Sequence, residues 1–337
     1  MKQTDEPSAG TYFLTADCGG TKSAFLLTDE TGHMAASYQK EDANYMVTGI
    51  PHLTAVLNAG LEECCRQAQI TPDRIRMFHV SAAGYGDIPE NEEQDTRKVQ
   101  SAVKAVPITL GSDTDNAIAG SLLGSSGIHV IAGTGSIGIG IDRNGNRIRC
   151  GGWHHFFGGD EGSAYWIACR LLQVFTKQAD GRLKETSVVP YLMKKYGLRE
   201  PEEILDLTLE KWGGRRENIA KLAIDAADLA AQNDPAAQNI FADAGVELAG
   251  IVMAIWRRGS FEAPVPVSWS GGVFGSLEYF RDSLEKHLAS IPHSLQAPAL
   301  PPLEGGILLA MQESGTAVPP EVIACLQEEV QKKEKSS

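Results

Sequence analysis

The sequence lacks the marks of an exported, membrane-spanning or metal-scaffolded protein. No two of its six cysteines have the C-x-x-C spacing of zinc or redox sites, which predicts free thiols at Cys18, Cys64, Cys65, Cys150, Cys169 and Cys325. The first residues contain no apolar signal-peptide core, and no run of about 18 apolar residues occurs along the chain. We therefore expect a cytoplasmic protein that has no membrane partner.

Positive charge is also scarce. The chain has 30 lysines and arginines against 43 aspartates and glutamates, which gives a formal net charge of −13. The summed field repels polyanions, and this argues against nucleic acid or an anionic membrane as a partner. A small anion such as a phosphate group would need a local site built from backbone N–H groups.

The length and composition are those of a two-lobed globular enzyme. Of the 337 residues, 42% are hydrophobic and 22% are charged, close to the globular average, so collagen-like, coiled-coil and low-complexity classes are excluded. At this size one hydrophobic core usually divides into two. The oligomeric state stays open, with a homodimer among the options.

A strand, a glycine turn, a second strand and an acidic glycine turn follow one another twice along the chain. The first copy spans residues 11–32 and the second spans residues 129–145. Such a repeated pattern suggests two related halves. Helical and strand-like segments alternate between and around the copies, which predicts an α/β fold.

The remaining segments complete this organisation. We expect strands at 77–80, 108–110 and 264–269, helices at 52–70 and after Asp160, a mainly helical stretch at 183–262 and a frayed or disordered tail at 327–337. We expect a first lobe at 10–118, a second lobe with a helical insertion at 119–316, and a C-terminal helix with a frayed tail at 317–337.

Three glycine turns after strands can carry nucleotide chemistry. Glycine lets backbone N–H groups approach phosphate oxygens without obstruction by a side chain, and a threonine or serine hydroxyl adds a further donor. Each turn alone reads more naturally as an ordinary hairpin, whereas the three together favour a nucleotide site. Neither the G-x-x-x-x-G-K-[ST] phosphate loop nor G-x-G-x-x-G before a helix is present, so P-loop and dinucleotide folds are disfavoured.

Four segments carry a resemblance to a known family. They are Asp17-Cys18-Gly19-Gly20-Thr21-Lys22, Gly133-Thr134-Gly135-Ser136, Ser270-Gly271-Gly272-Val273-Phe274, and the stretch from Gly152 to Trp166, GWHHFFGGDEGSAYW. With these segments the sequence resembles the N-acetylglucosamine kinases and their BadF/BadG/BcrA/BcrD-type ATPase relatives, within the actin-like superfamily of sugar kinases and chaperones.

The resemblance implies two ribonuclease-H-like lobes with ATP and Mg²⁺ in a cleft between them. It implies phosphorylation of an amino-sugar hydroxyl, with N-acetylglucosamine, glucosamine or N-acetylmuramic acid as the substrate. The first two segments, Asp17 to Lys22 and Gly133 to Ser136, would hold the phosphates, and Ser270, Gly271 and Gly272 would lie along the adenosine.

The resemblance also assigns roles to individual side chains. Asp113 would take the proton of the attacking hydroxyl; the alternatives are a helix N-cap role for Asp113, or Asp115 as the base. Asp17 would hold Mg²⁺ through water, or else cap its turn. Lys22 would pair with phosphate or stay solvated.

Sugar recognition is expected at Asn44, Asp113, Gly152, Trp153, Asp160 and Glu161. Asp160 accepts two hydroxyl bonds when ionised, although it is also a helix N-cap candidate, and Asn44 is also a turn candidate. We expect Trp153, Phe156 and Phe157 to pack rather than to form a sugar-stacking platform.

Two other functions remain open from the sequence. One is an ATPase that activates a dehydratase or reductase, which would need cysteines gathered around an iron–sulfur cluster. The other is a non-catalytic protein that binds sugar or nucleotide and assembles.

Overall fold

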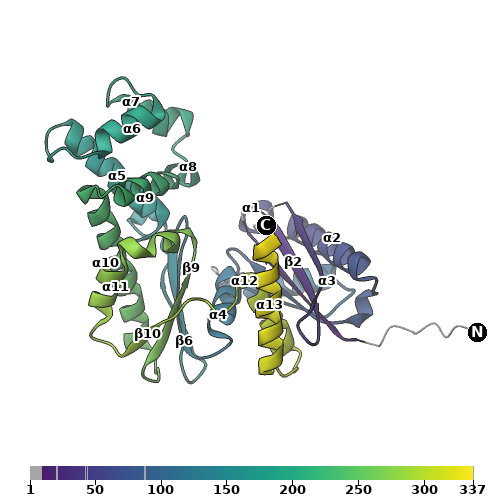
Figure 1. Ribbon diagram of the computed structural model, residues 1–337. Helices are drawn as coiled ribbons and strands as arrows, with labels where there is room; N and C mark the ends of the chain where they lie inside the picture. Colours follow the sequence, from purple (N-terminus) through teal and green to yellow (C-terminus); the bar gives the residue numbers. More distant parts are fainter. Residues whose placement is uncertain (1–9, 20–21, 42, 44, 87–88, 337) are drawn as a thin grey trace, which may run out of the picture. The chain divides into compact units, whose positions relative to one another are not determined.

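The computed structural model describes residues 10–19, 22–41, 43, 45–86 and 89–336, and the chain divides into two compact units (Figure 1). Unit 1 contains the residues up to Ser125 together with those from Ala297 onward, and unit 2 contains Ser126–Gln296. Each unit is built on one five-stranded sheet with helices packed against it.

The sheet of unit 1 begins with the expected meander. Its strands are β1 (Tyr12–Cys18), β2 (Ser23–Asp29), β3 (Met34–Lys40), β4 (Ile75–Ala82) and β5 (Ile108–Gly111). They lie in the order β3-β2-β1-β4-β5, with β1 to β3 antiparallel and β4 and β5 parallel to β1. The parallel strands bring the carboxyl ends of β1, β4 and β5 to one edge.

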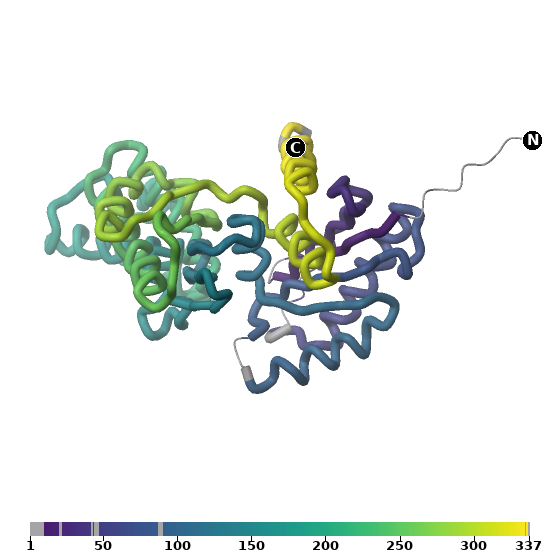
Figure 2. Tube along the Cα trace, turned by 90° about the horizontal axis from the view of Figure 1, so that it is seen from below, coloured from purple at the N-terminus to yellow at the C-terminus, as the bar shows by residue number. Residues whose placement is uncertain are grey.

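Helices cover both faces of this sheet. They are α1 (Tyr45–Thr48), α2 (Ile50–Ala68), η1 (Pro72–Arg74), α3 (Pro89–Ala102), α4 (Asp113–Leu122), α12 (Pro302–Glu313) and α13 (Pro320–Ser336). Leu53, Leu57 and Leu61 of α2 are buried in one core, while Phe13 and Leu26 face a second core with α12 and α13. Figure 2 shows the yellow C-terminal helices beside the purple N-terminal strands, although they lie at opposite ends of the chain.

Close packing explains why α12 belongs to unit 1. A Cβ atom at Gly305 would lie 2.2 Å from the carbonyl oxygen of Asn116, and one at Gly306 would lie 2.0 Å from Thr15 Oγ1. Only glycine permits this approach of α12 to α4 and β1. The sequence placed residues 297–316 in the second lobe, and this was wrong. The return of the chain to the core of unit 1 depends on contacts with distant residues, which leave no local signal in the sequence.

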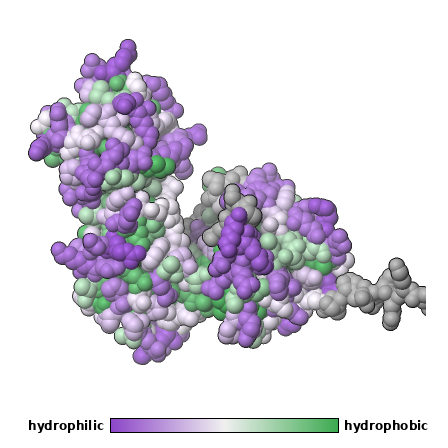
Figure 3. All heavy atoms as spheres, in the orientation of Figure 1, coloured by the Kyte–Doolittle hydropathy of each residue, from purple (hydrophilic) through white to green (hydrophobic). Residues whose placement is uncertain are grey.

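The C-terminal segment is more ordered than the sequence indicated. Helix α13 continues to Ser336 instead of fraying from residue 327, and Lys333 Nζ lies 3.2 Å from Glu304 Oε1 of α12. Its apolar residues Val322 and Leu326 are buried against α12, and its outer side is a hydrophilic strip in Figure 3. Tertiary packing therefore holds a helix whose end lacks apolar spacing.

Unit 2 repeats the sheet of unit 1. Its strands are β6 (Gly127–Ala132), β7 (Ser136–Ile141), β8 (Arg147–Gly151), β9 (Val265–Ser270) and β10 (His293–Leu295). Their order, β10-β9-β6-β7-β8, matches that of unit 1 strand for strand, with three antiparallel strands and two parallel ones. The two related halves are confirmed. The boundary lies after Ser125 rather than after 118, because α4 packs against α12 and against β1, β4 and β5 of unit 1.

The expected helical insertion separates β8 from β9. It consists of η2 (His155–Phe157), α5 (Ala164–Ala179), α6 (Val188–Tyr196), α7 (Glu203–Leu205), η3 (Asp206–Lys211), α8 (Arg216–Ala220), α9 (Leu222–Ala231) and α10 (Pro235–Arg258). After β9, η4 (Gly272–Tyr279) and α11 (Arg281–Leu288) follow.

Helix α10 is the one helix in the described part of the chain that is long and apolar enough to cross a membrane. Half of its most apolar stretch is buried inside the fold. Phe241, Leu248 and Val252 lie in the core of unit 2. We therefore assign α10 as a core helix.

Candidate active site

The carboxyl ends of the parallel strands of unit 1 carry the acidic residues expected to act in catalysis. Asp17, next to the end of β1, pairs with Ser81 of β4, and Ser81 pairs with Gly111 at the end of β5. Asp113 is the first residue of α4 and is exposed. The sheet thus places Asp17 and Asp113 at one edge.

The structure separates the roles of Asp113 and Asp115. Ser112, not Asp113, is the N-cap of α4, and the Asp115 carboxylate accepts hydrogen bonds from the Ser112 backbone N–H at 2.8 Å and from its hydroxyl at 2.9 Å. Asp115 therefore closes a capping box at the start of the helix. The N-cap alternative for Asp113 is wrong, and the local capping function falls to Asp115.

Asp17 is electrostatically coupled to Asp113. Burial, and to a smaller extent the negative charge of Asp113, raise the pKa of Asp17 to about 6, while the exposed Lys22 opposes the shift. Two carboxylates that repel each other in a partly buried site form a donor set suited to a hard divalent cation. The neighbouring Cys18 thiol is fully buried, which raises its pKa to about 12 and makes it inert.

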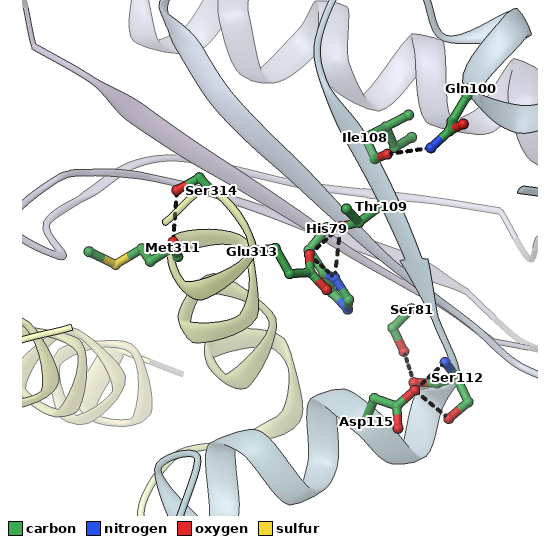
Figure 4. A network of polar contacts seen from close by, with 10 residues as sticks. All are labelled: His79, Ser81, Gln100, Ile108, Thr109, Ser112, Asp115, Met311, Glu313 and Ser314. Carbon is green, nitrogen blue, oxygen red and sulfur yellow. Dashed lines mark hydrogen bonds and ion pairs between the residues drawn. The ribbon is translucent and has the colours of Figure 1, made fainter. Parts of the chain in front are cut away.

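A polar network joins β4, β5 and α12 close to this edge (Figure 4). His79 is 2% exposed, and its Nδ1 lies 3.0 Å from Glu313 Oε2 and 3.1 Å from Thr109 Oγ1. A Cβ atom at Gly111 would lie 3.2 Å from the His79 ring and 3.0 Å from Asp115 Oδ2. The network fixes the segment that delivers Asp113 to the edge.

The first phosphate segment is described only in part. The Gly19 N–H donates to the Lys22 carbonyl at 3.1 Å, and the Gly19 carbonyl accepts from the Ala43 N–H at 3.3 Å. Gly20, Thr21 and Asn44 lie outside the described residues, so their assigned roles stay predictions.

The second glycine turn joins β6 to β7 and rests on the insertion. The Gly133 N–H donates to the Gly135 carbonyl at 2.9 Å. The carbonyls of Gly133 and Thr134 accept from the N–H groups of Ala164 and Tyr165, at 2.9 and 3.3 Å. The first turn of α5 thereby holds the turn in place.

The third glycine turn lies directly beside the second. Ser270 pairs with Ile131 across the parallel strands β9 and β6, and its hydroxyl lies 2.9 Å from His129 Nε2. Gly271 has a φ of 98°, and a Cβ atom there would lie 2.4 Å from the Ala132 carbonyl oxygen. Only glycine fits this position, whereas a Cβ at Gly272 would meet nothing within 4 Å.

A pocket of about 670 Å³ opens between these two turns and the helical insertion. Gly133, Thr134 and Gly272 line one side, and Ala220, Ile224 and Phe241 are among the residues that line the other. Its volume is within the range of small-molecule sites. Sequence reasoning found the turns but missed the helical wall, whose one signal is the run of small residues in α9.

Asp160 does not cap α5, contrary to one expectation. Ser163 is the N-cap, and its hydroxyl accepts from the Trp166 N–H at 3.2 Å. The Asp160 carboxylate is 5% exposed and instead accepts from the Ser136 N–H at 3.2 Å and from Arg216 Nη2 at 2.7 Å. Sequence reasoning missed Arg216, because an arginine 56 residues away carries no local signal.

The other residues of the predicted sugar segment surround Asp160. The Gly152 N–H donates to the Ser136 carbonyl at 2.9 Å, and the Glu161 carbonyl accepts from the Ser136 hydroxyl at 2.6 Å. Trp153, Phe156 and Phe157 are 70%, 83% and 81% exposed, so they do not have the packing role that the sequence led us to expect. Gly152 and Gly158, on either side of these aromatic residues, have φ angles of 68° and 78°, which glycine adopts without steric cost.

Known proteins are similar to this chain in sequence. The chain is 26% identical over 286 residues to the N-acetyl-D-glucosamine kinase of Dictyostelium discoideum, covering 82% of this chain and 89% of the relative. It is 27% identical over 278 residues to the N-acetylmuramic acid/N-acetylglucosamine kinase of Clostridium acetobutylicum, covering 82% and 90%.

A solved structure supports the fold. A protein of Chromobacterium violaceum, provisionally named N-acetylglucosamine kinase, aligns with a TM-score of 0.69 and 23% identity, over 90% of this chain and 99% of that one. The fold is therefore that of the actin-like ATPase sugar kinases. The sequence model of the BadF/BadG/BcrA/BcrD ATPase family matches residues 16–310. A match over most of the chain, from the end of β1 into α12, means that the chain belongs to this ATPase family.

Proposed function

We propose that the protein transfers the terminal phosphoryl group of ATP to a hydroxyl of an amino sugar, with N-acetylglucosamine or a close hexosamine relative as the substrate. Membership of the ATPase family implies the use of ATP. The names of the two relatives supply the sugar class. One observation carries the catalytic part: Asp113 is an exposed carboxylate at the head of α4, while the adjacent capping role is filled by Asp115.

Asp113 is the general base of the proposed reaction. Phosphoryl transfer asks the protein mainly to orient the nucleophile, to neutralise phosphate charge and to exclude water. Asp113 accepts a hydrogen bond from the sugar hydroxyl, and takes its proton as the oxygen bonds to the phosphorus and ADP leaves. The capping box of Asp115 with Ser112 keeps Asp113 at a fixed position on the helix.

Asp17 fits the role of an indirect ligand of Mg²⁺. The mutual repulsion of Asp17 and Asp113 marks a place where a bound cation would be stabilised. A Mg²⁺ ion held there would supply positive charge against the charge of the phosphates. Asp17 would hold its water ligands, and Lys22 would add positive charge nearby.

The two turns of unit 2 would bind the nucleotide. Gly133, Thr134, Gly135 and Ser136 supply a close backbone approach to phosphate, and the pocket between Gly133 and Gly272 accommodates an adenosine. Ser270 and Gly271 set the third turn against the second, so that one ligand can contact both.

The sugar would be selected by the segment around Asp160. Asp160 and Glu161 offer carboxylates, Gly152 allows a close approach of backbone, and the exposed Trp153 can cover the apolar face of a pyranose. Asn44, which lies outside the described residues, remains a sugar contact predicted from the sequence alone.

A coupled ADP-release assay across hexoses, hexosamines and their N-acetylated forms tests the proposal. We expect rapid ADP release with N-acetylglucosamine, glucosamine or N-acetylmuramic acid, and slow release with glucose. ADP release that is independent of any sugar would instead favour an ATPase that drives another protein. That alternative needs accessible cysteines gathered in one place, whereas Cys18, Cys64 and Cys65 are buried, and the partly exposed Cys150, Cys169 and Cys325 lie on three different elements, β8, α5 and α13.

A further inference from the structure

Arg216 lies against the second phosphate turn. Arg216 is the first residue of α8, and its Nη2 atom is 2.7 Å from Asp160 Oδ2. A Cβ atom at Gly135 would lie only 2.2 Å from Arg216 Nη2 and 2.6 Å from Asp160 Oδ1. The guanidinium and the carboxylate therefore both contact the backbone of the turn at Gly135.

The Asp160 carboxylate creates an electrostatic problem for a phosphate ligand. Its Oδ1 accepts from the N–H of Ser136, the last residue of the turn, and it is almost fully buried. A phosphate group bound at this turn would approach a buried negative charge, whose repulsion is strong because water screens it little. A cation is needed to make the turn suitable for an anion.

Arg216 supplies that cation and retains a further hydrogen-bond donor. Its Nε is buried and has no hydrogen-bond partner among the described residues. The next residue, Glu217, and Lys221 line the nucleotide pocket, so α8 joins the pocket to the ion pair. Asp160 itself has a φ of 62°, a left-handed backbone that only the surrounding contacts maintain for a non-glycine residue.

We propose that Arg216 is a positioning residue that neutralises Asp160 so that the second turn can accept the nucleotide phosphates. With the pair intact, Asp160 keeps the orientation in which it meets the sugar, and the turn carries no uncompensated negative charge. The inference rests on the nucleotide part of the proposed function and is independent of which sugar is phosphorylated.

Binding measurements with ADP and with adenosine test this role. The probes are titrated calorimetrically into the full chain and into Arg216→Ala, without any sugar. We expect the Kd of ADP to rise about tenfold or more in Arg216→Ala, because the phosphates then face an unpaired carboxylate. Adenosine has no phosphates, so its Kd should change less than about twofold by the same electrostatic reasoning. Arg215→Ala, which removes an exposed neighbouring arginine, is the matched control and should leave both constants unchanged.

A double substitution provides the decisive comparison. In Arg216→Ala/Asp160→Asn both charges are absent, so ADP affinity should return to that of Asp160→Asn alone. Arg216→Lys keeps the charge and should retain most of the ADP affinity. The proposal is overturned by unchanged ADP binding in Arg216→Ala, by equal losses for ADP and adenosine, or by a double variant that binds ADP no better than Arg216→Ala. Wild-type protein that binds ADP yet phosphorylates no sugar would instead overturn the proposed sugar kinase activity and leave the role of Arg216 standing.

Discussion

Units 1 and 2 share a strand order but carry different chemistry at the same position. In unit 1, Asp17 is the residue before the last in β1 and pairs with Ser81 of the parallel strand β4. In unit 2, the equivalent residue of β6 is Ile131, which pairs with Ser270 of β9. The acid of unit 1 is thus replaced by an apolar residue in unit 2.

The two units also differ in whether the carboxylates near this position are paired with a cation. Unit 1 places two carboxylates near each other, and burial together with Asp113 raises the pKa of Asp17 to about 6. Unit 2 places one carboxylate, Asp160, beside its glycine turn and pairs it with Arg216 at 2.7 Å. A duplicated scaffold therefore supports an acidic edge suited to a base and a cation in one unit, and a neutralised turn suited to an anion in the other.

The largest effect should come from removing the base of unit 1. Asp113→Asn keeps the shape of the side chain but cannot accept the hydroxyl proton, so kcat should fall by about 10² or more. Steady-state kinetics with ATP and the best sugar measure this. Asp115→Asn is the control. It should lower the melting temperature, because it weakens the cap of α4, and should change kcat far less than Asp113→Asn does. If Asp115→Asn abolishes turnover and Asp113→Asn does not, the assignment of the base is reversed.

The next effect concerns the glycine turns of unit 2. Gly271→Ala forces a Cβ to within 2.4 Å of the Ala132 carbonyl oxygen and should displace the neighbouring turn. The KM for ATP should rise roughly tenfold while the KM for the sugar changes little. Gly272→Ala meets no atom within 4 Å and should leave both constants near the wild-type values. A rise confined to the sugar KM would place the third turn in another site.

A smaller effect is expected at the aromatic loop. Because Trp153 is 70% exposed, Trp153→Ala should leave the melting temperature unchanged. If its ring covers the sugar, the sugar KM should rise about two- to tenfold. Leu205→Ala is the control, because Leu205 is also exposed but lies in α7, outside the loop that contains Trp153. Unchanged sugar kinetics in Trp153→Ala would remove the loop from recognition.

The smallest effect is a pH dependence of stability in unit 1. The pKa of Asp17 is raised from 3.8 to about 6, so the folded apoprotein binds this proton more tightly than the unfolded chain does. This contribution is fully present below about pH 4 and is lost as the pH rises through about 6. Asp17→Asn removes the buried charge, and its melting temperature should exceed that of the wild type at about pH 7.5 but match it near pH 4. An equal difference at both pH values would assign the effect to packing.

Much of the fold could be predicted from local pattern. The repeated strand and glycine-turn arrangement predicted two related halves, and the identical strand orders confirm them. The pattern of residues 183–262 predicted a mainly helical stretch, and the structure shows helices there, among them α10 from Pro235 to Arg258. Such features depend on neighbours within a few residues, which the sequence displays directly.

Features built from distant residues could not be predicted in this way. The return of α12 to unit 1 depends on contacts of Gly305 and Gly306 with α4 and β1, and these contacts leave no local mark. The pairing of Arg216 with Asp160 spans 56 residues, and the sequence indicated only a sugar contact or an N-cap role for Asp160. The exposed position of Trp153 was also missed, because tryptophan side chains are highly buried on average.

Product stoichiometry with N-acetylglucosamine and glucosamine distinguishes a sugar kinase from an ATPase that transfers no phosphate to sugar. Purified protein is incubated with ATP, Mg²⁺ and each sugar, and ADP, inorganic phosphate and sugar phosphate are quantified together by ³¹P NMR. If the protein is an amino-sugar kinase, it forms one sugar phosphate for each ADP and little inorganic phosphate. Asp113→Asn should form neither ADP nor sugar phosphate at a measurable rate. ADP and inorganic phosphate in equal amounts, with no sugar phosphate from either sugar, would contradict the account.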